Sequence, residues 1–470
     1  MTNPRAPDVL HIPVLGEILR WRRGRLLFQI PLFLILMLII YDGFTGPQFA
    51  PENTATVLAW VHYRGLVILL LLLAGNFFCM SCPFTLPRTI ARRLSLHGGR
   101  WPAKLRNKWI SVFSLFAIFW LYEWLDLWAS PLLTAWVAVA YLLLSFALEA
   151  WFAESAFCKY VCPLGAFNFT FSMLSPLQIT ERSQQVCRDC RGKECVNGDQ
   201  RVLGCGTELF VPTVQSNMDC VFCLDCARAC PYDNVALQIR SPLKEARTRL
   251  AAPGYALAFL ILSLIFTGVM SAFGMVPPVY RLQAWLAEAL LIRSEAALLL
   301  LMFGAGNLLL PAVTLFLIGW INKPPGRSLL QSARSEASQF VPALLPLGAG
   351  IWLAHYGFHL ATSGLAIVPV FQSFLLDHHI TLLGDRPRWD LSMLLPLDWI
   401  FPLQVAVILA GTFASFASLA LSGLENNHTP MQALRRILPW AVLLVLLAVA
   451  ALSVFNLPME MRGTLQIGNP

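Results

Sequence analysis

The 470-residue sequence is 57% hydrophobic but only 13% charged, whereas an ordinary soluble domain has about 25% charged residues. This composition excludes a soluble globular protein and places most of the chain in a lipid bilayer. The net charge of +8 comes mainly from basic residues next to apolar segments, so it indicates membrane topology and not binding to nucleic acid.

Nine apolar segments approach the length of about 20 residues that crosses a bilayer as a helix. They predict a mainly α fold, a polytopic transmembrane bundle with about nine spans. The segments are 26–41, 56–78, 110–128, 131–152, 253–273, 296–321, 339–361, 399–422 and 437–457.

Basic residues alternate between the loops. Four arginines precede the first span between residues 20 and 25, the loop 42–55 has no Lys or Arg, and residues 85–108 hold seven basic residues and no acidic one. Because basic loops stay on the cytoplasmic side, we expect a bacterial inner-membrane protein with its N-terminus and residues 153–252 in the cytoplasm. All twelve cysteines then lie on the cytoplasmic side, which favours metal or redox chemistry over disulfides.

Two Cys-Pro motifs follow apolar segments near that face. Cys79 and Cys82 precede Pro83, and Cys158 and Cys162 precede Pro163. On a helix each pair would share one face. Three interpretations stay open: the four thiols hold one metal centre, they act as two redox dithiols, or they are buried structural cysteines.

The polar segment 177–249 carries the other eight cysteines and divides the chain into membrane regions 1–176 and 250–470. Its second half has the spacing C-x2-C-x2-C-x3-C-P, which is the bacterial ferredoxin run that binds a [4Fe-4S] cluster. The four residues of this run are Cys220, Cys223, Cys226 and Cys230. The spacing favours iron and sulfide over zinc, for which two C-x2-C knuckles would be expected.

A looser run precedes it and consists of Cys187, Cys190, Cys195 and Cys205. In two-cluster ferredoxins the last cysteine of each run binds the other cluster. This rule predicts two [4Fe-4S] clusters in which Cys230 joins the first run and Cys205 joins the second. The alternative is that each run binds its own cluster with its own four cysteines.

Three histidines lie in predicted spans. His355 and His359 are four residues apart and therefore share a helix face, and His62 occupies a comparable depth in the second span. Ionisable residues inside a membrane are candidates for function. We expect either a metal, haem or quinone site here, to which a second helix must contribute, or ordinary hydrogen-bonded histidines.

The combination of a double ferredoxin motif with Cys-Pro motifs at helix ends resembles the membrane polyferredoxins of the NapH, MauN and NosR type. The resemblance covers about residues 60–245, and the later spans lie outside it. It implies an electron carrier that works between a cytoplasmic or quinone donor and a membrane or periplasmic redox partner, more than a stand-alone enzyme. The alternative is a maturation or metal-handling protein, for example one that reduces copper for a periplasmic enzyme.

Overall fold

The computed structural model is mainly helical, with 70% of its residues in helices and 3% in strands. Its chain forms two compact units, each assembled from separated segments. The first unit comprises Met1–Met37, Leu69–Arg106 and Val139–Glu245, and the second comprises Leu38–Ile68, Asn107–Ala138 and Ala246–Pro470. The structure describes residues 7–86, 90, 99–152, 154–199, 202–251, 254–425 and 429–459.

Eight helical segments among the described residues are long and apolar enough to cross a membrane. They support a multi-pass membrane protein and match eight of the predicted spans. They are α2 (Gly24–Thr45), Thr54–Ala74 with α3 (Thr54–Thr56) and α4 (Tyr63–Ala74), α8 (Pro131–Trp151), α13 (Tyr255–Phe273), Glu295–Ile321 with α15 (Glu295–Gly304) and α16 (Leu310–Ile321), Leu329–Ser363 with α17 (Leu329–Phe340) and α18 (Leu345–Ser363), α20 (Leu397–Glu425) and α21 (Pro430–Phe455).

The ninth predicted span, 110–128, is the shorter helix α7 (Trp109–Trp124). Its 16 residues span roughly 24 Å, less than the bilayer core of about 30 Å. The helix ends early because Asp126 adopts a left-handed conformation with φ 44°. That conformation cannot continue a right-handed helix.

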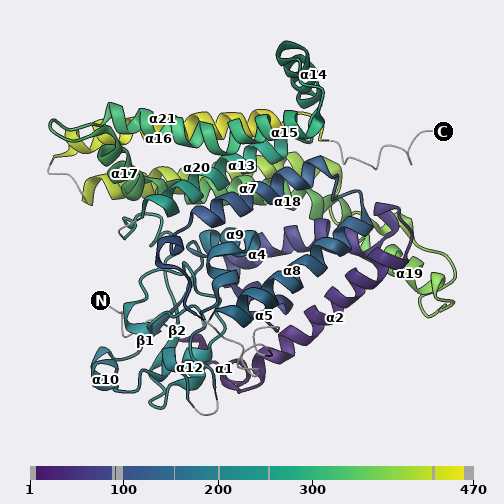
Figure 1. The fold of residues 1–470 in the computed structure, drawn as a ribbon, viewed down its shortest axis with the longest axis horizontal. Helices are drawn as coiled ribbons and strands as arrows, with labels where there is room; N and C mark the ends of the chain where they lie inside the picture. The colour runs from purple at the N-terminus through teal and green to yellow at the C-terminus, as the bar shows by residue number, and fades with distance from the viewer. Residues whose placement is uncertain are drawn as a thin grey trace. The chain divides into compact units, whose positions relative to one another are not determined.

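The first unit contains a small two-stranded sheet, and both cysteine runs lie between its strands in the sequence. Strands β1 (Leu177–Glu181) and β2 (Val235–Ile239) pair antiparallel, with Leu177 opposite Ile239 (Figure 1). The segment between the two strands consists mainly of loops, and the pairing of the strands brings its two ends together. Its helices are short: α10 (Gln184–Asp189), α11 (Glu194–Asn197) and α12 (Asp225–Ala229).

The N-terminal segment packs onto the same sheet. Asp8 caps a short helical turn and forms a bridge with Gln238 of β2. Leu10 is fully buried in a cluster that includes Ile179 and Leu237. The remaining helices of this unit are α1 (Leu15–Arg20), α5 (Phe77–Ser81) and α9 (Pro163–Ser172).

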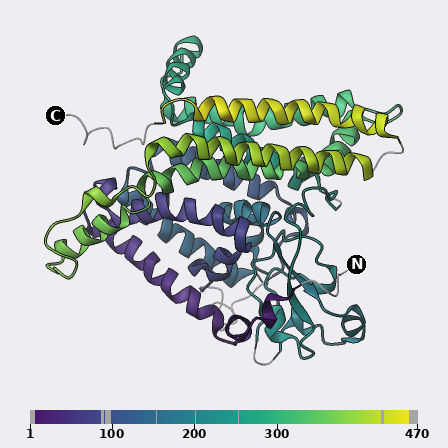
Figure 2. The same cartoon turned by 180° about the vertical axis from the view of Figure 1, so that it is seen from behind.

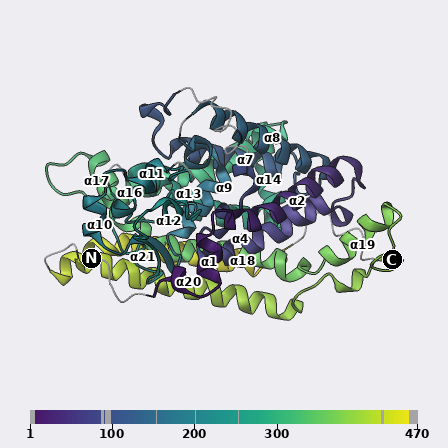
Figure 3. The ribbon, with the colours of Figure 1, turned by 90° about the horizontal axis from the view of Figure 1, so that it is seen from below.

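The helical segment Leu329–Ser363 lies at the centre of the second unit. In its most apolar stretch, 89% of the residues are buried inside the protein. Helices α13 and α20 pack against α18, and α21 packs along α20 (Figure 2). Helix α17 lies beside α16 (Figure 3). The remaining helices are α14 (Pro278–Leu290) and α19 (Ile367–Asp377).

A short 3-10 turn, Val341–Leu344, separates α17 from α18. Pro342 and Pro346 lack the N–H that an α-helical ladder needs, which accounts for the tighter turn at this point. Helix α17 begins with a capping box, in which the Ser328 and Gln331 side chains satisfy each other's backbone N–H groups.

Candidate functional site

The first cysteine run of the polar segment occupies α10 and α11. Cys187 lies in α10, Cys190 ends that helix, and Cys195 lies in α11. The backbone N–H of Cys205 donates to the carbonyl of Cys195 at 3.0 Å, which closes the intervening loop. This hydrogen bond holds Cys195 and Cys205 close together although nine residues separate them.

The second run follows a loop with left-handed residues next to its cysteines. Asp219, Phe222 and Leu224 have φ values of 66°, 54° and 60°. This backbone curls the loop, and the N–H of Phe222 donates to the Cys220 thiol. Such strained conformations concentrate at functional sites. Cys226 then lies in α12, and Cys230 follows the end of that helix.

The last cysteine of each run lies with the other run. Burial raises the pKa of Cys195, and the thiols of Cys187 and Cys230 raise it further. Burial also raises the pKa of Cys226, and the Cys205 thiol raises it further. Because Coulomb effects fall with distance, the structure groups the thiols across the runs. The two sets are Cys187, Cys190, Cys195 and Cys230, and Cys205, Cys220, Cys223 and Cys226.

Hydrogen-bond donors surround these sulfurs. The side-chain amide of Asn234 donates to Cys187 Sγ at 3.1 Å, and its backbone N–H donates to Cys230 Sγ at 3.4 Å. The N–H of Leu209 donates to Cys205 Sγ at 3.4 Å. Donors of this kind stabilise negative charge on sulfur and tune the potential of a bound centre.

Burial favours the neutral, protonated thiol at Cys220 and Cys223. Burial raises the pKa of Cys223 to about 12, and it raises that of Cys220 well above the ordinary value. A metal must therefore displace protons from these sulfurs, as ligation requires the thiolate.

Among the described residues, no three Cys, His, Asp or Glu side chains form a group that could hold a metal ion. A single zinc ion with bonds of about 2.3 Å draws its sulfurs to within about 4 Å of one another. A four-iron cluster binds each thiolate to a different iron and keeps the sulfurs farther apart.

The two Cys-Pro motifs also lie in the first unit. Cys79 is in α5, and Cys82 directly follows that helix. Cys158 lies in a π-helical turn, Phe157–Val161, and Cys162 caps the start of α9, where its Sγ accepts from the N–H of Gly165 at 3.2 Å. The cysteines therefore occupy helix ends, and they do not lie on the continuous helices that the spacing suggested. Single π turns are common at functional sites.

These four thiols lie near enough to influence one another electrostatically. Burial raises the pKa of Cys158 well above its ordinary value, and Glu149 and the other three cysteines raise it further. Burial raises the pKa of Cys79 to about 11, although Asn168 acts in the opposite direction. The Asn168 amide donates to Cys79 Sγ at 3.3 Å. Thiolates are the ligands that thiophilic metals prefer.

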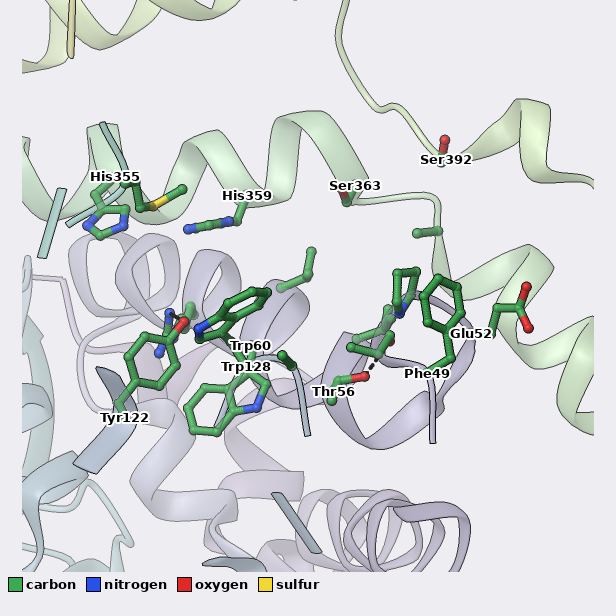
Figure 4. Close-up of a pocket in the computed structure, with 18 of the residues that line it drawn as sticks. Phe49, Glu52, Thr56, Trp60, Tyr122, Trp128, His355, His359, Ser363 and Ser392 are labelled. Atoms are coloured by element: carbon green, nitrogen blue, oxygen red, sulfur yellow. Dashed lines mark hydrogen bonds between the residues drawn. The ribbon is translucent and has the colours of Figure 1, made fainter. Parts of the chain in front are cut away.

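The three histidines belong to the second unit, in which His355 and His359 line a pocket of about 500 Å³. Figure 4 shows both rings projecting from α18 toward Trp60 and Tyr122. His62 is not among the lining residues. Its ring nitrogens lie 3.1 Å from the Val57 carbonyl and 2.8 Å from the Gly364 carbonyl.

Arg64 lines the pocket and was not identified from the sequence. It is only 7% exposed and lies 4.7 Å from the ring centroid of Trp60 and 4.2 Å from that of Tyr122. Its Nη1 donates to the Tyr122 hydroxyl at 2.9 Å. A charged residue in the apolar segment 56–78 is a functional candidate, and this signal could have found it.

No protein-family model and no solved structure matches the chain. A segment of 116 residues is 30% identical to a protein of Escherichia coli (strain K12) that is named "Putative electron transport protein YccM". This segment covers 24% of the chain and 30% of that protein. The eight membrane-length helices fit a multi-pass protein in a lipid bilayer.

Proposed function

We propose that the chain is a membrane-bound electron-transfer protein whose eight cysteines in residues 187–230 bind two [4Fe-4S] clusters. The observation that carries this proposal is the exchange of the last cysteines, with Cys230 near the first run and Cys205 near the second. Two-cluster ferredoxins bind their clusters in this way. Bound clusters would accept and donate single electrons.

The protein's own residues would set the potentials. Asn234 and the backbone N–H of Leu209 donate to cysteine sulfurs, and the thiols of the second set are largely buried. Hydrogen bonds to sulfur favour the more negative, reduced form, whereas burial opposes it. The two surroundings differ, which supports distinct potentials for the two centres.

The four helix-end cysteines supply a third metal centre in this proposal. Their mutual influence and the Asn168 donor support ligation over separate structural roles. The basic loops favour a cytoplasmic location for the cluster segment and an inner-membrane protein. Electrons would then pass between a cytoplasmic or quinone donor and a membrane or periplasmic acceptor.

Single Cys→Ser variants test the cluster assignment. After anaerobic purification, electron paramagnetic resonance should show that Cys230→Ser perturbs the same centre as Cys187→Ser. Cys205→Ser should perturb the same centre as Cys220→Ser. Ser155→Ala is the control, because it alters a buried hydroxyl outside the cysteine runs. If Cys230→Ser and Cys220→Ser perturb one and the same centre, the exchanged ligation is wrong.

A further inference from the structure

The pocket of the second unit is not explained by the cysteine centres. Candidate membrane spans supply part of its wall: Trp60 and Arg64 come from Thr54–Ala74, and His355 and His359 from Leu329–Ser363. A pocket of about 500 Å³ is large enough for a small-molecule head group. A ligand that reaches it from the bilayer must be lipid-soluble.

We propose that this pocket binds the head group of a quinone from the lipid bilayer. The proposal rests on the electron-transfer function above, since a relay in a membrane needs a redox partner. Quinones combine a flat apolar ring with carbonyl oxygens. The pocket offers a surface for each of these parts.

Aromatic side chains supply the surface for the ring. Trp60, Tyr122 and Trp128 lie on one side of the pocket, facing the histidines of α18 (Figure 4). The Trp60 indole is held in place because its Nε1 donates to the Thr134 hydroxyl at 2.9 Å. Flat rings stack favourably on such fixed aromatic surfaces.

Two buried nitrogens supply donors for the oxygens. Among the described residues, Nδ1 of His355 and Nε1 of Trp128 have no hydrogen-bond partner. The His355 side chain is only 1% exposed, so an unsatisfied nitrogen there is costly. A quinone carbonyl that accepts a hydrogen bond from either nitrogen would remove this cost.

Charged groups match the redox chemistry. Reduction of the quinone takes up two electrons and two protons to form the quinol, and oxidation returns them. The electrons would be exchanged singly with the iron-sulfur centres of the proposed relay. Arg64, fixed by Tyr122, would stabilise negative charge on the ring oxygens, and His355 and Glu123 line the pocket as groups that can carry protons.

Other ligands fit the pocket less well. A lipid acyl chain has no polar atoms that could bind the buried arginine and the two histidines. Burying such ionisable residues in a membrane costs free energy. A metal held by His355 and His359 would need a third ligand, and the described residues form no such group.

Binding of ubiquinone-1 and of 2,3-dimethyl-1,4-naphthoquinone to the full-length protein in nanodiscs tests this inference by calorimetry. We expect His355→Leu and Trp128→Phe each to weaken binding of at least one probe about tenfold, as for a lost hydrogen bond. His355→Gln, which keeps a side-chain N–H, should retain most of the affinity. His379→Asn is the control, because His379 is exposed and its φ of 60° suits asparagine.

The thermal midpoint of each variant must stay near that of the parent, which shows that the variant is folded. If His355→Leu does not fold, Trp128→Phe provides a second variant, because it keeps an aromatic ring. The proposal is overturned if neither probe binds, or if all folded variants bind both probes equally. Iron analysis separates the two proposals. Iron-sulfur signals without quinone binding overturn only the pocket assignment, whereas quinone binding by a protein without iron overturns the relay.

Discussion

The side-chain amide of Asn234 donates a hydrogen bond to Sγ of Cys187 at 3.1 Å, although 47 residues separate them in the sequence. The same amide donates to the Ser183 carbonyl at 2.7 Å, and its oxygen accepts from the Ser183 N–H at 2.9 Å. Asn234, which directly precedes β2, therefore fixes the start of the first cysteine run beside the start of that strand.

Asn234→Asp should lower the reduction potential of the centre bound by Cys187. The carboxylate keeps the shape of the amide but removes the N–H donor and adds negative charge beside the sulfur. We expect a shift on the order of 60 mV, equivalent to a tenfold change for one electron. A potential titration followed by electron paramagnetic resonance measures it. An unchanged potential, or an equal shift of both centres, would contradict this role of Asn234.

Cys79→Ser should remove the third centre and leave the two ferredoxin-type centres in place. The four helix-end thiols influence one another, and in the proposed centre the loss of one leaves an incomplete ligand set. Iron content and redox spectra of the purified protein measure the loss. The matched control is Ser81→Ala, because Ser81 is buried in the same helix and its hydroxyl donates to the Phe77 carbonyl at 3.1 Å. If every metal signal survives in Cys79→Ser, the third centre is wrong.

Arg240→Met should destabilise the loop that carries Cys220. Arg240 and Glu245 are a buried pair, and a Glu245 oxygen accepts from the Asn217 N–H at 2.9 Å, three residues before Cys220. Removal of one member of a buried pair costs about 3 to 5 kcal/mol. The double variant Arg240→Met/Glu245→Gln removes the unpaired charge and should recover part of this loss in thermal unfolding.

The effect of Arg240→Met should depend on pH. Burial raises the pKa of Glu245 above its ordinary value even though Arg240 acts to lower it. Without Arg240 the pKa of Glu245 rises further, and the folded protein binds a proton that the unfolded chain has lost. The destabilisation should therefore shrink as pH falls from 8 to 5. Thermal midpoints measured at both values test this, and a larger loss at pH 5 would contradict it.

The long apolar segments and the cysteine spacing were readable from sequence because both signals are local. Eight spans were predicted near their positions, and α7 is shorter because the left-handed conformation of Asp126 ends it. The span at 339–361 begins earlier, at Leu329. Its first part is polar, yet Glu336 and Gln339 are buried in the second unit. Glu336 accepts from the Asn322 side-chain amide at 2.9 Å, a tertiary contact that hydropathy cannot predict.

The pocket could be predicted only in part. His355 and His359 stood out as ionisable residues in an apolar segment, but their neighbours Arg64, Tyr122 and Trp128 come from distant segments. Tryptophan and tyrosine near span ends are also typical of the membrane interface. The sequence alone therefore did not identify Tyr122 and Trp128 as residues that line a pocket. Only the packing of the second unit brings these residues together.

We propose above that this membrane protein holds two [4Fe-4S] clusters for electron transfer. The most direct test is electron paramagnetic resonance of the anaerobically purified full-length protein during a potential titration, combined with iron analysis. We expect two signals of four-iron clusters and at least about eight iron atoms per chain, four for each cluster. Fewer than about eight irons per chain, or the absence of four-iron signals at every potential, would contradict it.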